Sequence, residues 1–276
     1  MSNPLGFFYN STENWQKFAG KTGMLVTGRC NRYDPVFAKA REAGAEVLAY
    51  IDPCDVPDHR VCALDESFYM NDHSKVPLWP YPAPGVRSGW PRHLITDMRE
   101  GSAWCKYVLD YLHKLMDDGR LSGVFLDVLG ARRWQRSEWD KWPVEERAEW
   151  TNGCIAFVRE LDRLRRQSNA NFIVVNNNFW NSGAKTFLEG EKYVDGICIE
   201  HHSISNMSAV LAAGRRYSDL GHRRVLWIAK STQEAQVIAQ VPGVTHVSDQ
   251  KTYEHPGEPP VPLSDLTRAQ GPDADR

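Results

Sequence analysis

Five short apolar runs in this sequence each end in a polar or acidic residue: VLAYID at Asp52, HLITD at Asp97, VFLD at Asp127, FIVVNNN at Asn178 and ICIE at Glu200. A strand of a parallel sheet that is covered on both faces is continuously apolar, and the chain becomes polar where it leaves the core. If these runs are strands of one parallel barrel, their polar ends share a rim, which is where enzymes of that fold carry their active sites. The pattern therefore predicts a buried parallel sheet with an acidic rim.

The apolar runs alternate with helical patterns along most of the chain. Strands are predicted at residues 5–9, 24–27, 46–52, 93–97, 123–128, 172–176, 196–200 and 224–229. Helices are predicted at residues 35–43, 102–118, 144–166, 206–213 and 232–240. Regular alternation of this kind requires parallel strands joined by right-handed crossovers. We therefore predict an α/β fold, a single (β/α)8 TIM barrel, although a doubly wound open sheet would have the same local pattern.

Length and composition agree with one large domain. The chain has 276 residues, of which 42% are hydrophobic, and a single α/β barrel commonly takes about 250 residues. We predict a barrel domain over residues 1–254 and an extended tail over residues 255–276, which are rich in proline and have no apolar period. Residues 244–253 are either one extra strand or a segment covering the rim.

The net charge and the N-terminal residues bear on which partners the protein binds and whether it is exported. A net charge of -2 gives no electrostatic case for binding nucleic acid or a membrane. The first residues, MSNPLGFFYN, lack the basic and long apolar regions of a signal peptide, so we expect synthesis in the cytoplasm without export. The six cysteines form no CxxC pair and are expected to be reduced, buried thiols.

Asp127 and Glu200, at the ends of the fifth and seventh predicted strands, are the predicted catalytic residues. A glycosidic bond is usually cleaved by two carboxyl groups, of which one protonates the leaving oxygen and the other attacks the sugar or activates a water. The sequence thus predicts Glu200 as the acid and Asp127 as the nucleophile or base.

Other polar residues near the predicted strand ends would complete a sugar site. Asp97 lies two residues before Arg99, and a carboxylate beside a guanidinium stays ionised, which suits Asp97 to orienting a substrate. The remaining members of this predicted polar ring are Tyr9, Asp52, Asn176, Asn177 and Asn178.

Two long connections are rich in aromatic residues. Residues 53–92 contain the run PLWPYPAPG, and residues 130–143 contain Trp134 among several arginines. Flat indole faces stack on sugar rings, so Trp134 is a predicted sugar contact. Most of the ten tryptophans are nevertheless expected to pack helices onto the barrel, because large aromatic side chains are usually well buried.

His201 and His202 follow Glu200 directly and raise an alternative, a divalent metal held by a histidine and Asp127. Adjacent strand residues face opposite sides, so one of the two histidines at most could join a ligand set. A hydrogen-bonded or solvent-facing histidine accounts for the pattern more simply. We therefore predict no metal and no cofactor, and we assign His202 to the sugar site.

The order of LAYID, LITDMR, SGVFLDVLG, VVNNN and VDGICIEHH resembles the endo-alpha-1,4-polygalactosaminidase and spherulin-4-like glycoside hydrolases, a group with a TIM barrel. The resemblance spans residues 6–230. It implies that Asp127 and Glu200 are the catalytic carboxylates, and that Tyr50, Asp97 and Arg99 line the sugar site. After Asp127 this chain has VLG where the group has asparagine and then aspartate, so the resemblance implies the reaction class and leaves the sugar open.

We therefore predict an endo-acting glycoside hydrolase that cleaves a microbial surface or extracellular polysaccharide. Two alternatives are a carbohydrate-binding barrel without turnover and a metal-dependent hydrolase of the deacetylase type. A glycan-cleaving barrel with no signal peptide and a proline-rich tail would suit a phage tail, so a virion-associated protein docked to an assembly partner through residues 255–276 is a further hypothesis. A frayed terminus explains the tail equally well.

Overall fold

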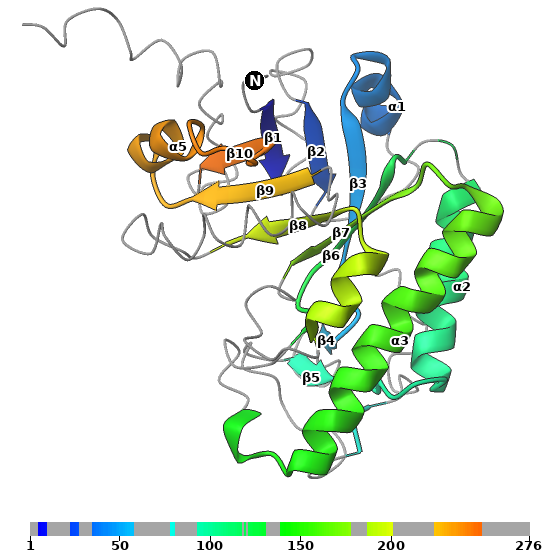
Figure 1. Cartoon of the computed structure of the whole chain (residues 1–276). Coiled ribbons are helices and arrows are strands. Elements are labelled where there is room, and N and C mark those ends of the chain that lie inside the picture. The colour runs from blue at the N-terminus through cyan, green and yellow to red at the C-terminus, as the bar shows by residue number, and fades with distance from the viewer. Residues whose placement is uncertain are drawn as a thin grey trace, which may run out of the picture. The chain divides into compact units, whose positions relative to one another are not determined.

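The computed structural model describes residues 5–9, 23–27, 35–57, 78–80, 93–117, 119, 121–130, 139–177, 187–200 and 224–249. Within them, the chain folds as an α/β barrel of the TIM type (Figure 1). Following the chain, the barrel strands are β1 (Leu5–Tyr9), β2 (Met24–Thr27), β3 (Glu46–Ile51), β6 (Gly123–Leu126), β7 (Ile173–Asn177), β8 (Gly196–Ile199), β9 (Arg224–Ala229) and β10 (His246–Asp249). Each strand neighbours the next in this order, and β10 pairs with β1. The predicted fold class is confirmed.

One predicted barrel strand was wrong. Residues 93–97 contain β5 (His93–Ile95), which pairs antiparallel with β4 (Asp55–Pro57) in a separate two-stranded sheet. The place in the barrel is taken by β10, which lies in the stretch predicted as an extra strand or a rim segment. An apolar run shows that a segment is a buried strand but does not show which strand it pairs with, so the sequence pattern could not separate the two.

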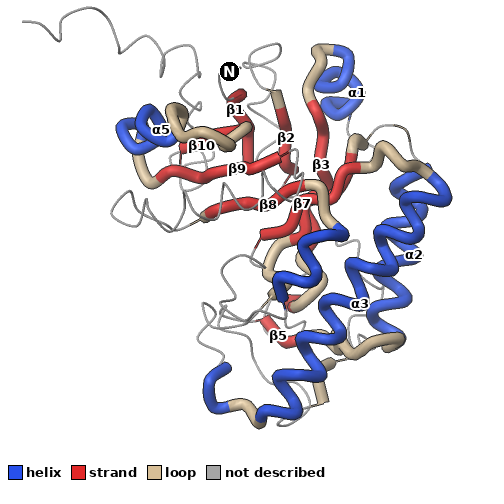
Figure 2. Tube along the Cα trace, viewed as in Figure 1, coloured by secondary structure: helices blue, strands red, loops and turns tan. Residues whose placement is uncertain are grey.

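The predicted helices are present where the structure describes them (Figure 2). They are α1 (Pro35–Glu42), α2 (Ala103–Asp117), α3 (Val144–Ser168) and α5 (Thr232–Ile238), with short 3-10 turns η4 (Trp139–Lys141) and η6 (Phe187–Tyr193). The predicted helix at residues 206–213 lies outside the described residues. Ser231 is the N-cap of helix α5, and its side chain accepts a hydrogen bond from the Glu234 amide at 3.1 Å.

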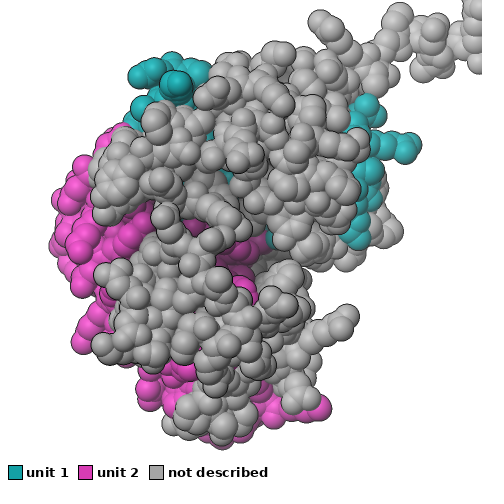
Figure 3. All heavy atoms as spheres, turned by 180° about the vertical axis from the view of Figure 1, so that it is seen from behind, with its two compact units in different colours: residues 1–49, 120–123, 195–276 teal, residues 50–119, 124–194 magenta. Residues whose placement is uncertain are grey.

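The chain divides into two compact units, coloured teal and magenta in Figure 3. Unit 1 comprises residues 1–49, 120–123 and 195–276, and unit 2 comprises residues 50–119 and 124–194. In unit 1 the strands pair in parallel, with Phe8 opposite Leu25, Val26 opposite Leu48 and Val247 opposite Trp227. All of β8 and all but the first residue of β9 are buried, as expected for strands covered on both faces.

The amino-terminal ends of three strands in unit 1 carry a polar cluster. Arg224, the first residue of β9, donates with Nε to Glu46 of β3 at 2.8 Å and makes a second, shorter bond through Nη2. His246, the first residue of β10, is buried, and its Nδ1 lies 2.9 Å from Thr245 Oγ1. A methyl group on Gly196 would lie 2.5 Å from the Arg224 carbonyl oxygen, so the close approach of β8 and β9 at this end requires glycine.

Helices α2 and α3 pack against each other in unit 2. Helix α3 also approaches the backbone of Met98 so closely that a methyl group on Gly153 would lie 1.9 Å from the Met98 carbonyl oxygen. Four buried tryptophans gather next to α3: Trp79 stacks on Trp142 at 5.9 Å and meets Trp150 edge to face at 4.9 Å, and Trp139 lies 5.3 Å from Trp142. These indoles form core, as expected for most of the tryptophans.

No helix in the described part of the chain is long and apolar enough to span a membrane. The four described cysteines, Cys54, Cys105, Cys154 and Cys198, are buried and are not in disulfides. Their burial agrees with the expectation that they act as small apolar side chains.

Candidate functional site at the end of β6

Asp127 directly follows β6, at the carboxyl end of a barrel strand in unit 2. Its side chain is partly exposed, and its two oxygens have different donors. Asn177 Nδ2 donates to Oδ1 at 2.8 Å, the Val128 amide donates to the same oxygen at 2.9 Å, and the Tyr50 hydroxyl donates to Oδ2. The carboxylate is thus held in one orientation by side chains from β3 and β7.

Tyr50 of β3 reaches Asp127 because side chains alternate along β6, which places Phe125 and Asp127 on the same side. The Tyr50 ring stacks on Phe125, with ring centroids 5.9 Å apart and planes 18° apart. Residues two apart on a strand share a face, so the Tyr50 and Phe125 contact on adjacent segments brings the hydroxyl next to Asp127. The Asp127 amide also donates to the Ile51 carbonyl at 2.9 Å, which fixes the end of β6 beside the end of β3.

Val128 has an unusual backbone conformation. Its φ is 62°, in the left-handed region that β-branched residues rarely adopt. Strained residues of this kind cluster at active sites and ligand clamps. At this position the left-handed turn lets the Val128 amide point back to Asp127 Oδ1.

The sequence analysis placed Asn176, Asn177 and Asn178 in the polar ring of the site. In the structure Asn177 bonds the Asp127 carboxylate, whereas Asn176 is fully buried and donates to the Leu129 carbonyl at 3.1 Å. Adjacent residues of β7 face opposite sides, so one of the two had to face Asp127, but the sequence could not show which. Asn178 lies outside the described residues.

Asp52 lies just past the end of β3 and is largely buried, with 8% exposed. Its Oδ1 accepts hydrogen bonds from the amides of Cys54 at 2.8 Å and Asp55 at 3.1 Å. Burial, followed by the charges of Asp55, Cys54 and Asp127, raises the pKa of Asp52 well above its usual value of 3.8. Asp52 was predicted as a sugar contact, and the structure places it in a buried carboxyl pair.

Asp55 and His93 were missed by the sequence analysis. Asp55 is fully buried in β4, and its Oδ1 lies 2.7 Å from His93 Nδ1 in β5. The two residues meet because β4 and β5 pair antiparallel, with Pro57 opposite His93 and Asp55 opposite Ile95. This pairing joins segments 38 residues apart, and no local sequence signal indicates it.

Asp97 and Arg99 follow β5 and therefore do not lie at the end of a barrel strand, which corrects their predicted placement. Arg99 binds Asp97 with both branches of its side chain, Nε to Oδ1 at 2.9 Å and Nη2 to Oδ2 at 2.7 Å. The backbone carbonyl of Asp97 accepts from the Ser102 hydroxyl at 2.6 Å, next to the start of α2. The predicted ion pair is present, and it is anchored to α2.

The other predicted site residues are described in part or not at all. Glu200 directly follows β8, in unit 1, and is partly exposed. The backbone of Tyr9 ends β1, but its side chain lies outside the description, as do Trp134, His201, His202 and the tail at residues 255–276. Their predicted roles, and a partner bound through the tail, stay predictions.

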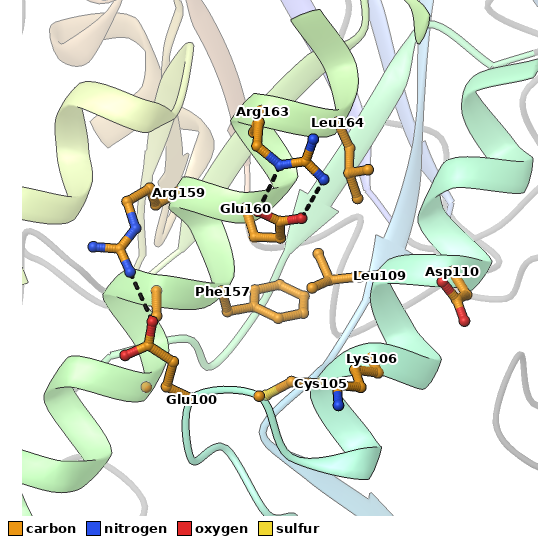
Figure 4. Close-up of a pocket in the computed structure, with 13 residues that line it drawn as sticks. Glu100, Cys105, Lys106, Leu109, Asp110, Phe157, Arg159, Glu160, Arg163 and Leu164 are labelled. Carbon is orange, nitrogen blue, oxygen red and sulfur yellow. Dashed lines mark hydrogen bonds and ion pairs between the residues drawn. The ribbon is translucent and has the colours of Figure 1, made fainter. Parts of the chain in front are cut away.

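A cavity of about 410 Å³ lies between α2 and α3, and Figure 4 shows the side chains that line it. Leu109 and Phe157 form its apolar part, and the Arg159 to Glu100 and Arg163 to Glu160 ion pairs lie at its edges. Asp127 and the polar residues around it do not line this cavity. It is therefore distinct from the candidate site.

Among the described residues, no group of three or more histidine, cysteine, aspartate or glutamate side chains is arranged to hold a metal ion. The hypothesis of a metal held by His201 or His202 concerns residues outside the description, so it stays untested.

Comparison with solved structures shows that the fold is shared with carbohydrate-active proteins. The glycoside hydrolase domain of PelA from Pseudomonas aeruginosa, as a glutamate-to-alanine variant, is 13% identical, with a TM-score of 0.66 over 94% of this chain and 98% of that one. Aspergillus fumigatus Ega3 in complex with galactosamine is 14% identical, with a TM-score of 0.53 over 89% of each chain.

A third structure, the galactosidase domain of the alpha-galactosidase-sucrose kinase AgaSK, has a TM-score of 0.55 at 13% identity and covers 90% of this chain and 38% of that one. No family model and no curated protein matches the sequence. The barrel implied by the motif resemblance is therefore confirmed by structures. A shared fold does not by itself fix the chemistry, which has to be argued from the site.

Proposed function

We propose that this chain is a glycoside hydrolase that cleaves a microbial surface or extracellular polysaccharide, with Asp127 as nucleophile or base and Glu200 as acid. The observation that best supports the proposal is the environment of Asp127, whose two oxygens are bonded by Asn177 and Tyr50. Donors that bond the charged form of a carboxyl group favour the anion. The anion is the form that attacks an anomeric carbon or activates a water.

Glu200 is proposed as the partner because it also ends a barrel strand. Enzymes of this fold carry their reacting groups at the carboxyl ends of the barrel strands. An acid on the opposite side of the glycosidic bond would protonate the leaving oxygen. An aspartate and a glutamate are the residue types that glycoside hydrolases use for this pair.

A galactosamine polymer is the first substrate to test. Ega3, which shares the fold, was crystallised with galactosamine, and the sequence motifs resemble polygalactosaminidases. The different residues after Asp127 favour testing a wider panel as well, including glucosamine- and arabinogalactan-type polymers.

The decisive experiment compares glycan cleavage by the wild type, Asp127→Asn and Glu200→Gln. Each variant is expected to lose at least about a thousandfold in kcat, within the range for a reacting carboxyl group. Asp110→Asn is the matched control, because it makes the same chemical change at an exposed position of α2. Thermal unfolding of each protein shows whether a loss of activity reflects a loss of folded protein.

The outcomes separate three functions. Chelator-insensitive cleavage that both variants lose supports the two-carboxylate mechanism. Cleavage that a chelator abolishes would instead support the metal-dependent hydrolase, and binding of a polymer without any cleavage would support a carbohydrate-binding barrel. The anomer released, followed by NMR, then shows whether Asp127 attacks the sugar, giving retention, or activates a water, giving inversion.

A further inference from the structure

His93 and Asp55 form a hydrogen-bonded pair between β5 and β4, in which His93 Nδ1 lies 2.7 Å from Asp55 Oδ1. The Asp55 side chain is fully buried, whereas 33% of the His93 side chain is exposed. The two nitrogens of an imidazole ring lie on different edges of the ring. The edge of His93 that carries Nε2 is therefore turned away from the buried carboxyl group.

The Nε2 atom of His93 is held ready for a ligand. No described residue bonds it, and the bond from Nδ1 to Asp55 fixes the orientation of the ring. A carboxyl group orients a histidine in this way in metal sites and in catalytic triads. A metal ion would need more ligands, and the described residues include no group of three that could supply them. A sugar hydroxyl both donates and accepts, so it can bond Nε2 whether or not that nitrogen carries a hydrogen.

The pair lies close to the proposed reacting group, as a series of backbone bonds shows. The Asp127 amide donates to the Ile51 carbonyl at 2.9 Å, at the end of β3. The next residue, Asp52, accepts from the Asp55 amide at 3.1 Å. Asp55 and Asp127 are both close enough to Asp52 to raise its pKa. A polymer bound at Asp127 therefore has His93 as a neighbour.

We propose that His93 is a substrate-binding residue whose Nε2 bonds a hydroxyl group of the glycan beside Asp127, and that Asp55 is the positioning residue that holds its ring. The choice of a glycan as the ligand rests on the proposed function. The bond is to a part of the polymer that does not react, so it is present in the ground state and in the transition state alike. Such a bond lowers KM and leaves kcat unchanged.

Two substitutions at position 93 separate glycan binding from the bond to Asp55. The NH2 group of asparagine takes the place of Nδ1, so His93→Asn keeps a donor for Asp55 and loses Nε2. The NH2 group of glutamine takes the place of Nε2, so His93→Gln keeps a partner for the hydroxyl. KM is expected to rise about tenfold in His93→Asn, as for one lost hydrogen bond, and to rise less in His93→Gln. The kcat and the thermal unfolding midpoint of His93→Asn should equal those of the wild type.

His113→Asn is the matched control. His113 lies in α2, is also partly exposed, and has one ring nitrogen, Nε2, at 2.7 Å from Ser168 Oγ. Its substitution should leave KM unchanged. A folded His93→Asn protein with the KM of the wild type would show that His93 only satisfies the buried Asp55, and would overturn the proposal.

Histidine modification tests the contact without turnover. Diethyl pyrocarbonate reacts with accessible imidazole nitrogens, and peptide mass spectrometry measures the extent at each histidine. The protein is Asp127→Asn, which should bind glycan without consuming it, and the probes are galactosamine-, glucosamine- and arabinogalactan-type polymers. The polymer that binds is expected to suppress the modification of His93 and to leave that of His113 unchanged. Modification of His93 that no polymer suppresses would overturn the proposal.

A failure of the proposed function gives a different result. If a polymer is bound but never cleaved, it still protects His93, and His93→Asn binds it with a higher Kd, so the protein is a carbohydrate-binding barrel that uses His93. If cleavage depends on Asp127 while His93 is neither protected nor needed for a low KM, the function stands and the role of His93 is wrong.

Discussion

At the amino-terminal ends of the strands in unit 1, opposite charges meet: Arg224 binds Glu46, and the buried His246 lies beside them. Just beyond the carboxyl-terminal ends of β3 and β6, in unit 2, like charges gather instead, with Asp55 and Asp127 close enough to Asp52 to raise its pKa. The ion pair between Arg224 and Glu46 joins the ends of β9 and β3. The neighbouring carboxyl groups disfavour the ionised form of one another, and such shifted pKa values are typical of functional sites.

The comparison also extends to the backbone. Gly196 in unit 1 permits two strands to approach each other, whereas Val128 in unit 2 adopts a left-handed conformation although it is β-branched. Gly196 avoids a steric clash at the amino-terminal end. Val128, at the carboxyl-terminal end, is strained in its left-handed conformation, but this conformation lets its amide donate to Asp127. Substitutions at the two ends should therefore affect different properties, stability at the first and activity at the second.

The largest effect on stability is expected from His246. Burial, partly offset by Glu46 and reinforced by Arg224, lowers the pKa of His246 from 6.5 to about 4. The unfolded chain takes up a proton near pH 6.5 and the folded chain does not until about pH 4, so this stabilisation is present above pH 6.5 and is lost as the pH falls towards 4. The loss is about 3 kcal/mol of unfolding free energy across that window.

Urea unfolding of the wild type and His246→Asn at several pH values measures this loss of unfolding free energy. Asparagine does not titrate and keeps an atom for the Thr245 contact, so the difference in unfolding free energy between the two proteins should shrink as the pH falls from 6.5 towards 4. A constant difference across that range would show that His246 has an ordinary pKa, and would remove one contrast between the strand ends.

Gly196→Ala should cost about 2 kcal/mol of unfolding free energy, because the added methyl group meets the Arg224 backbone and the strands must shift. Chemical denaturation measures the cost. The kcat per folded molecule should remain close to that of the wild type. A Gly196→Ala protein as stable as the wild type would show that the approach of β8 and β9 does not require glycine.

The sequence predicted the barrel and most of its elements because continuous apolar runs and helical periods are local signals. It placed β5 in the barrel instead of β10, since strand pairing depends on contacts far apart along the chain. For the same reason it anticipated Asp127 and Tyr50 but not Asp55 and His93, which meet only through the pairing of β4 with β5. The choice between Asn176 and Asn177 depended on which face of β7 points to Asp127.

Tyr50→Phe tests the carboxyl-terminal end of the strands. It should lower kcat and leave stability unchanged, the reverse of what is expected for Gly196→Ala. The substitution removes the donor to Asp127 Oδ2 and keeps the ring that stacks on Phe125. We expect kcat to fall about tenfold, corresponding to about 1.4 kcal/mol for one hydrogen bond to a charged group, with little change in the midpoint of thermal unfolding. Steady-state kinetics and thermal unfolding on the same samples decide this. A large drop in stability without a drop in kcat would make Tyr50 a structural residue.

Ser122→Ala is the smallest change and the counterpart of Tyr50→Phe at the amino-terminal end, since it too removes one hydroxyl. The Ser122 hydroxyl accepts a hydrogen bond from the Val47 amide at 3.0 Å, just before β6 begins. Its loss leaves that amide without this acceptor and should lower the unfolding free energy by about 1 kcal/mol, with kcat unchanged. Denaturation and kinetics of the two variants together measure the contrast. If Ser122→Ala reduced kcat as much as Tyr50→Phe, a single hydroxyl at either end would affect catalysis equally, and the division between a structural end and a reacting end would not hold.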